Sequence, residues 1–526
     1  MPRKVKQLKA QSSKLKDIFL CMLSSGMLIL SFPRFNLEFL AWAGFVPVFF
    51  ALKNKTLWQS FLLFFITGIV FWSGIIYWLV NVTLPGTIVL ILYLALYFGV
   101  FALIIRPFTK RSAPYVLIFI PSVWVLLEFS RSHLLTGFPW ALLGYSQYLH
   151  LQVIQIADIT GVWGVSFLVM AVNVAIVEIA WSWLNRIQPR LRISIAFLVS
   201  LLLLAFFYGS FRLSGWKTAG RKNPIRISVI QGNIPQELKW DIRARGFIME
   251  RYFDISADAL KDRPDFMVWP EASLPVALED APYYFESVKN FAREIKTPVL
   301  VGAVTLRDGL YYNSALLVSR DGETAERYDK LHLVPFGEYI PLRAQLPFLE
   351  AVVPIGDFTP GKEYTIFNVT SQRPGGNGLA SDSQSQRPQA TSRFSVLICF
   401  EDLFPQLSRE FVKKGAQFLI NVTNDAWFGK TSSAEQHLSA SVFRAAENRV
   451  SLVRSANTGI SGFIAPTGKI VSSVKDASGN DIFTPGYKTQ DIYSRRGGFS
   501  FYTRYGDILI FALIIFVIYC IFRFKS

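Results

Sequence analysis

Long apolar runs fill most of residues 1–213, whereas short apolar runs alternate with polar ones between about 214 and 500. From Lys55 to Arg106 no charged residue intervenes, which leaves room for two membrane-spanning helices of roughly 20 residues each. Other runs of bilayer length, bounded by charge, Pro or Gly, predict spans at 18–33, 36–53, 113–131, 161–184, 193–211 and 506–522. The pattern therefore predicts an α-helical transmembrane bundle of about eight spans, seven of them in 1–213 and the last in 501–526.

Composition supports the same interpretation, because hydrophobic residues make up 52% of the 526 residues and the mean hydropathy is +0.34. The first apolar run follows a basic stretch but no small-residue cleavage site, which indicates an uncleaved anchor rather than a signal peptide. Glu128 and Arg131 end one span and are expected to extend to the membrane interface. The run Gly137-Phe138-Pro139-Trp140 is typical of a re-entrant or interfacial loop.

The distribution of Lys and Arg between alternate loops predicts the orientation. Sixteen of these residues fall on the side that holds both termini, against two, Arg34 and Arg131, in the short loops opposite. The positive-inside rule makes the first side cytoplasmic, so that 214–500 lies on the outer face. The net charge of +17 is then largely a matter of topology, and membrane lipids are expected as neighbours rather than nucleic acid.

Between 225 and 472 the alternation predicts one α/β layered domain. Strands are expected at 225–233, 265–271, 298–304, 394–400, 417–423, 451–456 and 461–472, a hairpin at 311–328, and helices at 236–260, 282–295, 405–414 and 434–449. The segment 370–392 is rich in Ser, Gln, Gly and Pro, which is typical of a flexible surface loop.

Three chemically useful side chains follow predicted strands of this domain: Glu271, Lys330 and Cys399. In open α/β sheets reactive groups gather at the carboxyl ends of strands. A thiol attacks a carbonyl as thiolate, an acid can take its proton, and an amine can stabilise the developing oxyanion with a backbone N–H. Spacing alone leaves the plainer interpretation open, in which these are a core thiol, a surface acid and a solvated cation.

No disulfide or metal site is expected. Cys21 and Cys520 lie inside apolar runs, so Cys399 has no evident partner. His332 and His437 are candidate bases or ligands, but no cluster with metal-ligand spacing surrounds them.

Three ordered segments resemble the signatures of the nitrilase (carbon–nitrogen hydrolase) superfamily: Trp269-Pro270-Glu271-Ala272-Ser273, the run from Tyr328 to Glu338, and Ile398-Cys399-Phe400-Glu401-Asp402. The runs 421–428 and 444–449 are similar to further segments of that superfamily. With spans on both sides of this domain, the whole chain resembles the bacterial apolipoprotein N-acyltransferase family.

The resemblance implies a nitrilase-like αββα domain in the periplasm of a Gram-negative bacterium, with both termini of a multi-pass inner-membrane protein in the cytoplasm. It implies domains at 1–213, 214–500 and 501–526. The implied reaction moves an acyl chain from a phospholipid, such as phosphatidylethanolamine, through a Cys399 thioester to the amino group of a diacylglyceryl-cysteine. No cofactor is implied, and a monomer is expected.

The same resemblance implies roles for individual residues. Glu271 would be the base, Lys330 the oxyanion-stabilising residue and Cys399 the nucleophile. Supporting and flexible positions would be Glu338, Glu401, the backbone N–H of Phe400, Trp240, Trp427 and Phe428. Some relatives carry Tyr at the position of Phe400, so that hydroxyl is missing here.

Two other functions remain open from the residues. A membrane-tethered amidase or nitrilase would use the same three side chains with water as acceptor. A transporter or scaffold would carry a degenerate domain, although charges within the spans are sparse, which disfavours an ion path.

Overall fold

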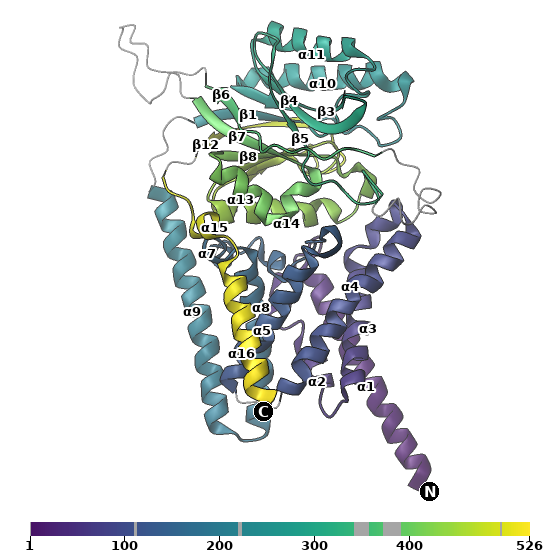
Figure 1. Ribbon diagram of the computed structural model, residues 1–526, viewed down its shortest axis with the longest axis vertical. Helices are drawn as coiled ribbons and strands as arrows, with labels where there is room; N and C mark the ends of the chain where they lie inside the picture. Colours follow the sequence, from purple (N-terminus) through teal and green to yellow (C-terminus); the bar gives the residue numbers. More distant parts are fainter. Residues whose placement is uncertain are drawn as a thin grey trace. The chain divides into compact units, whose positions relative to one another are not determined.

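The computed structural model describes residues 2–109, 113–218, 224–340, 357–371, 391–494 and 497–525. The chain divides into two compact units (Figure 1). The helical unit comprises Met1–Ser214 and Tyr505–Ser526, and the α/β unit comprises Gly215–Arg504. Most of the predicted loop at 370–392 lies outside the described residues.

The helical unit contains most of the predicted spans as helices: α1 (Pro2–Ser31), α3 (Leu57–Ile75), α4 (Leu84–Ile105), α5 (Ala113–Arg131), α8 (Val162–Leu184), α9 (Gln188–Thr218) and α16 (Ile508–Lys525). Within the described ranges, four helices are long and apolar enough to cross a membrane, at Leu57–Ile75, Leu84–Phe108, Val162–Leu184 and Gln188–Gly215. Helices α3 and α4 pack closely at Gly68, where an added methyl group would lie 3.0 Å from Cα of Ala95 and from Cβ of Phe98.

The predicted span at 36–53 is not one continuous helix. It forms a 3-10 turn, Glu38–Trp42, followed by the short helix α2 (Val46–Ala51). Pro47 in the first turn of α2 has no N–H, which suits a new helix start but not a helix interior. On α8, Asn173 ties the two pieces together, because its Nδ2 donates to the carbonyl of Ala41 and its Oδ1 accepts from the N–H of Phe45.

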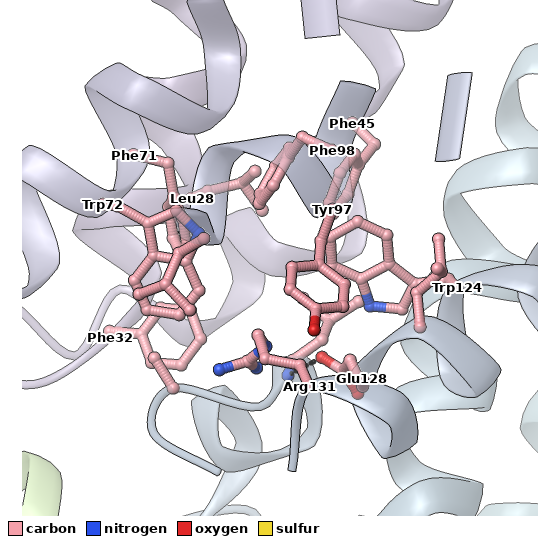
Figure 2. A pocket seen from close by; sticks show the side chains of 14 residues that line it. Leu28, Phe32, Phe45, Phe71, Trp72, Tyr97, Phe98, Trp124, Glu128 and Arg131 are labelled. Atoms are coloured by element: carbon pink, nitrogen blue, oxygen red, sulfur yellow. Dashed lines mark hydrogen bonds between the residues drawn. The ribbon is translucent and has the colours of Figure 1, made fainter. Parts of the chain in front are cut away.

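Glu128 and Arg131 do not extend to an interface as predicted, because both are buried in the helical unit. Figure 2 shows them beside a pocket walled by aromatic rings. The Arg131 guanidinium donates from Nη1 to the carbonyls of Phe138 and Trp140, and the N–H of Leu143 donates to Glu128. These two charged residues therefore hold the loop that follows α5.

The α/β unit contains two six-stranded sheets, with strand orders β12-β1-β2-β3-β4-β5 and β11-β10-β9-β8-β7-β6. The strands of the first sheet are β1 (Pro224–Gln231), β2 (Phe266–Val268), β3 (Val299–Arg307), β4 (Leu310–Val318), β5 (Thr324–Asp329) and β12 (Gly486–Tyr493). Those of the second are β6 (Phe367–Thr370), β7 (Thr391–Ile398), β8 (Phe418–Thr423), β9 (Ser451–Ala456), β10 (Gly462–Ile464) and β11 (Ile470–Ser473).

The two sheets pack face to face, with helices on both outer sides (Figure 1). Helices α10 (Arg245–Ala259) and α11 (Pro282–Ile295) cover the first sheet, and α13 (Pro405–Lys413) and α14 (Ser433–Asn448) cover the second. Between the sheets the rings of Phe266 and Phe394 stack with centroids 5.4 Å apart. The Ser455 hydroxyl crosses the same interface to the carbonyls of Ile230 and Val268. This arrangement is the predicted αββα sandwich.

One predicted helix begins later than expected. The pattern predicts a helix over 236–260, whereas the chain turns through 236–241 and α10 begins only at Arg245. The Asp241 carboxylate accepts from the backbone N–H of Arg243, which makes a new start more favourable than continuation. The turn also buries Lys239 against the backbone of Glu271.

Candidate active site

The residues that follow three strands meet at one place in the α/β unit. Glu271 follows β2, Lys330 follows β5, and Cys399 begins a 3-10 turn, Cys399–Leu403, directly after β7. The Nζ of Lys330 lies 3.7 Å from Oε1 of Glu271, and the charges of both residues act on the Cys399 thiol. The structure therefore brings together the acid, amine and thiol that sequence analysis selected.

A fourth residue holds two carboxylates beside that amine. Asn313 on β4 donates from Nδ2 to Oε1 of Glu271 and to Oε1 of Glu338, at 2.8 Å each. Lys330 also donates to Glu338, at 2.9 Å. Burial opposes the charge on Lys330, but Glu338 and Glu271 outweigh it and raise the pKa of Lys330 above its ordinary value. Lys330 is therefore a fixed cation.

Cys399 sits in a strained backbone conformation. Its φ is 53°, in the left-handed region that a residue with a side chain seldom occupies. Burial, followed by the charge of Glu271, raises the pKa of the Cys399 thiol, and Lys330 offsets this only in part. The resting thiol is therefore protonated, so that nucleophilic attack requires a neighbouring base.

Glu401, two residues after Cys399, is bonded on both carboxylate oxygens. It accepts from the backbone N–H groups of Ile398, Leu331 and His332 and from the hydroxyl of Tyr328. Burial raises the pKa of Glu401 to about 7, although these donors and Lys330 act in the opposite direction. Glu401 thus ties the turn at Cys399 to the segment that follows Lys330.

The predicted flexible aromatic residues lie on two segments that are joined at their bases. Trp240 and Trp427 are exposed, and Phe428 is partly exposed. The Asn424 side chain donates to Gln236, which links the segment before Trp240 to the segment before Trp427. Phe400, the residue after the thiol, is half-buried against the rings of Phe404 and His332.

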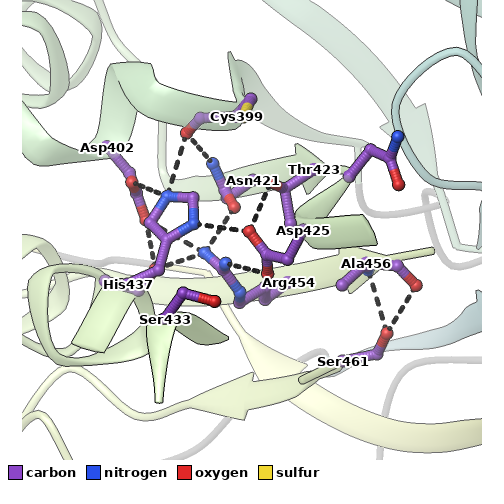
Figure 3. Close-up of polar contacts among 12 residues, drawn as sticks. Cys399, Asp402, Asn421, Thr423, Asp425, Ser433, His437, Arg454, Ala456 and Ser461 are labelled. Atoms are coloured by element: carbon purple, nitrogen blue, oxygen red, sulfur yellow. Dashed lines mark hydrogen bonds and ion pairs between the residues drawn. The ribbon is translucent and has the colours of Figure 1, made fainter. Parts of the chain in front are cut away.

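A group of buried polar side chains from the second sheet, the turns after its strands and helix α14 supports the backbone of Cys399 (Figure 3). The Cys399 carbonyl accepts from Nδ2 of Asn421 at 3.0 Å and from Nε2 of His437 at 3.3 Å. His437 also contacts two carboxylates, Asp402 at 2.8 Å and Asp425 at 3.0 Å.

Sequence analysis missed several residues of this site. Asn313 is an ordinary interior residue of β4, and Asn421 of β8, so that neither stands at a strand end. Lys239 fell within a predicted helix. Burial lowers the pKa of Lys239 to about 8, although the charge of Glu271 acts in the opposite direction. The charged form of Lys239 is therefore less stable in this site than in water. His437 was considered only as a base or ligand.

Comparison with protein families gives two matches along the chain. Residues 24–175 match the apolipoprotein N-acyltransferase N-terminal domain, and residues 226–494 match the carbon-nitrogen hydrolase family.

Comparison with individual proteins gives relatives of full length. An apolipoprotein N-acyltransferase of Geobacter metallireducens is 39% identical over 95% of this chain and 93% of its own length. One from Pasteurella multocida is 31% identical over 88% of each chain. Among solved structures, an amidase of the nitrilase superfamily from Nesterenkonia AN1 matches 55% of this chain and 95% of its own, with 16% identity and a TM-score of 0.37.

Proposed function

The chain belongs to the apolipoprotein N-acyltransferase family, and we propose that it transfers acyl chains through a thioester on Cys399. The donor in this proposal is a phospholipid such as phosphatidylethanolamine, and the acceptor is the amino group of a diacylglyceryl-cysteine at the start of an apolipoprotein. The observation that carries the proposal is the convergence of a protonated thiol, a carboxylate and a fixed cation at three strand ends.

In the first half-reaction the Cys399 sulfur attacks the donor ester carbonyl while Glu271 takes the thiol proton. The negative charge that develops on the carbonyl oxygen is stabilised by Lys330 and by the backbone N–H of Phe400. The ester C–O bond then breaks, and the lysophospholipid alkoxide leaves with the proton that Glu271 held. A thioester on Cys399 remains, and Glu271 is again a carboxylate beside the protonated Lys330.

In the second half-reaction the acceptor amine attacks the thioester carbonyl, and Glu271 takes a proton from the nitrogen. The C–S bond breaks, an amide forms, and the sulfur regains the proton from Glu271. The first product leaves before the acceptor binds, so the kinetics are ping-pong. Glu271 is suited to shuttle protons, because within the described part of the chain its Oε2 accepts no hydrogen bond.

The other residues are proposed to support this chemistry. Glu338 and Asn313 hold Glu271 and Lys330 at their spacing, and Glu401 fixes the turn at Cys399. Trp240, Trp427 and Phe428 are proposed to move as the lipid substrates enter and leave. We propose that the protein acts as a monomer.

We also propose that the helical unit crosses the bacterial inner membrane eight times, with 214–500 in the periplasm and both termini in the cytoplasm. Contacts within the helical unit support this topology. Lys55 pairs with Asp17, and Arg106 donates to the carbonyl of Lys55, so that these three residues share one end of the unit. The broken segment at 36–53 therefore returns the chain to the end of the helical unit that holds Asp17, where the first predicted span begins. Such a break is tolerated because its central residues are buried in protein.

Contacts at the other end of the helical unit support the proposed path of the chain. Trp163, at the start of α8, donates to Asp507, just before α16. Arg212, near the end of α9, pairs with Asp158, which precedes α8. The chain therefore enters 214–500 and leaves it at the same end of the helical unit. Acyl chains of both substrates can then stay in the bilayer, which avoids roughly 0.8 kcal/mol per CH₂ moved into water.

Mass spectrometry of the intact protein tests this function. After mixing with phosphatidylethanolamine in detergent micelles, the wild type should gain one acyl chain that maps to Cys399 and is removed by hydroxylamine. A diacylated lipopeptide with a free N-terminus should then discharge it as a triacylated product, whereas an N-acetylated lipopeptide should not. Cys399→Ser is the matched control. Release of fatty acid without triacylated product would instead show that water is the acceptor.

A further inference from the structure

The peptide bond between Cys399 and Phe400 joins a carbonyl that is held by buried side chains to an N–H that faces the reaction in the proposed function. Its carbonyl accepts from Asn421 and His437, and its N–H is the donor that the proposed function assigns to the oxyanion. A peptide unit is planar and trans, so its C=O and N–H point in opposite directions. The bonds that hold the carbonyl therefore also set the direction of the Phe400 N–H.

His437, one of the two residues that hold this carbonyl, belongs to a set of four charged side chains, which we call the ionic cluster: Asp402, Asp425, His437 and Arg454 (Figure 3). Nη1 of Arg454 lies 3.2 Å from Asp402, and its Nη2 lies 3.2 Å from Asp425. His437 bridges the same two carboxylates from the other side. All four side chains are almost fully buried.

His437 must carry a proton on each ring nitrogen to donate to acceptors on both sides. Nδ1 faces the Asp425 carboxylate, and Nε2 faces both Asp402 and the Cys399 carbonyl. Burial and Arg454 oppose this charge, but Asp402 and Asp425 outweigh them and raise the pKa of His437 to about 9. The ionic cluster therefore pairs two cations with two anions and shares one cationic N–H between Asp402 and the Cys399 carbonyl.

Asn421 completes the support with a neutral contact. Its Oδ1 accepts from Arg454 at 2.7 Å, and its Nδ2 donates to the Cys399 carbonyl. Hydrogen bonds on a carbonyl polarise its peptide unit, so the N–H at the other end becomes a stronger donor. The left-handed φ of Cys399 would relax without such a hold.

We propose that the ionic cluster, acting through His437 and Asn421, is a positioning device that aims and polarises the Phe400 N–H at the oxyanion. This inference rests on the proposed function, since it assumes that an acyl carbonyl reacts at Cys399. His437 and Asn421 are positioning residues that contact neither substrate nor sulfur. Loss of Asn421 removes no charge and should thus slow steps that build an oxyanion while sparing reactions of the thiol that build none. Loss of the His437 charge also acts on the thiol, because its partner Asp425 raises the pKa of Cys399.

Two reactions of the same thiol separate these cases. Acylation by phosphatidylethanolamine passes through an oxyanion, whereas alkylation by iodoacetamide displaces iodide at a saturated carbon and builds none. His437→Gln and Asn421→Ala should each slow single-turnover acylation at least about tenfold, approaching the 10²–10³ that loss of an oxyanion donor costs. Alkylation should stay within about threefold of the wild type in Asn421→Ala, and in His437→Gln it should fall by less than acylation does. Because both residues hold one peptide, the double variant should be slowed less than the product of the two single effects.

Ser439→Ala is the matched control, since Ser439 is a buried residue of α14 that donates to Gln436 and lies outside the ionic cluster. It should leave both rates unchanged. If His437→Gln fails to fold, Asn421→Ala carries the test, because it leaves the four charges paired. Acylation at the wild-type rate in the variants would overturn the inference, as would an equal fall of acylation and alkylation, which would indicate general damage to the site. A wild type that alkylates but never acylates would instead refute the proposed function.

Discussion

Glu271 and Glu401 are both buried carboxylates that follow strands of the α/β unit, yet their surroundings differ in one respect. Glu401 accepts hydrogen bonds on both oxygens from four donors. Among the described residues, Glu271 accepts one hydrogen bond, from Asn313, and it lies near Lys330. A carboxylate whose lone pairs are all occupied holds structure, whereas one with an oxygen to spare can accept a proton.

The largest effect that follows from this contrast is on chemistry at Glu271. Glu271→Gln keeps the shape and the contact with Asn313 but cannot take a proton, so acyl-thioester formation should fall roughly 10³-fold, within the range for general-base catalysis. Rapid-quench measurement of the Cys399 adduct checks this. Glu286→Gln, an exposed acid on α11, is the control. A normal rate in Glu271→Gln would remove Glu271 from the mechanism.

Glu401→Gln should act mainly on stability. The amide NH₂ of the glutamine would replace a carboxylate oxygen that accepts hydrogen bonds, so two donors would face each other. This should lower the free energy of unfolding by about 3 kcal/mol. Denaturant unfolding in detergent, followed by circular dichroism, measures this loss. If Glu401→Gln kept the stability of the wild type but formed the acyl-thioester as slowly as Glu271→Gln, Glu401 would take part in the chemistry and would not differ from Glu271 in role.

Glu338 lies between these two cases, because it contacts Lys330, the cation proposed to stabilise the oxyanion, whereas no contact with the Cys399 thiol is seen among the described residues. Glu338→Gln keeps the bond from the N–H of Val334 but removes the carboxylate nearest to Lys330. The pKa of Lys330 should fall, and acylation should slow roughly tenfold, less than the effect of a lost base. The same rapid-quench assay measures it, with Glu286→Gln again as control. A loss equal to that in Glu271→Gln would show that Glu338 also moves protons.

A separate effect is on the pH dependence of stability. The pKa of Glu401 is about 7 in the folded state and near 4.3 in an unfolded chain, so the folded state binds more protons between these values. Its contribution to stability is present below about pH 4.3 and is lost as pH rises through about 7, by at most about 1.4 kcal/mol per pH unit. The difference in unfolding free energy between wild type and Glu401→Gln should follow this slope. A difference that does not change with pH would contradict it.

Much of the α/β unit could be predicted from the sequence, because local patterns determine it. The helix predicted at 282–295 is α11, and the strands predicted at 417–423 and 451–456 are β8 and β9 within one residue. Glu271, Lys330 and Cys399 were accessible for the same reason, since a strand pattern shows where its end lies. Asn313 gave no such signal, because its role depends on side-chain contacts with Glu271 and Glu338, which lie 42 and 25 residues away in the sequence.

The helical unit shows a different limit. Hydropathy reports that the segment 36–53 avoids water, but not whether it faces lipid or protein. Ala41, Phe45 and Val48 are fully buried in protein, and contacts with Asn173 stabilise a break that the apolar pattern does not reveal. For the same reason Glu128 and Arg131 were placed at an interface, when their partners are backbone groups of a loop that follows them.

Gly302 on β3 shows how a residue without chemistry can limit a catalyst. A methyl group there would lie 2.4 Å from the carbonyl oxygen of Pro270 and 2.7 Å from Cα of Glu271, and backbone atoms cannot swing aside as a side chain can. Even alanine would have to displace the main chain that carries the base. A genetic screen for inactive enzymes would then recover Gly302 beside the reactive residues, and the harm would come from one carbon atom behind them.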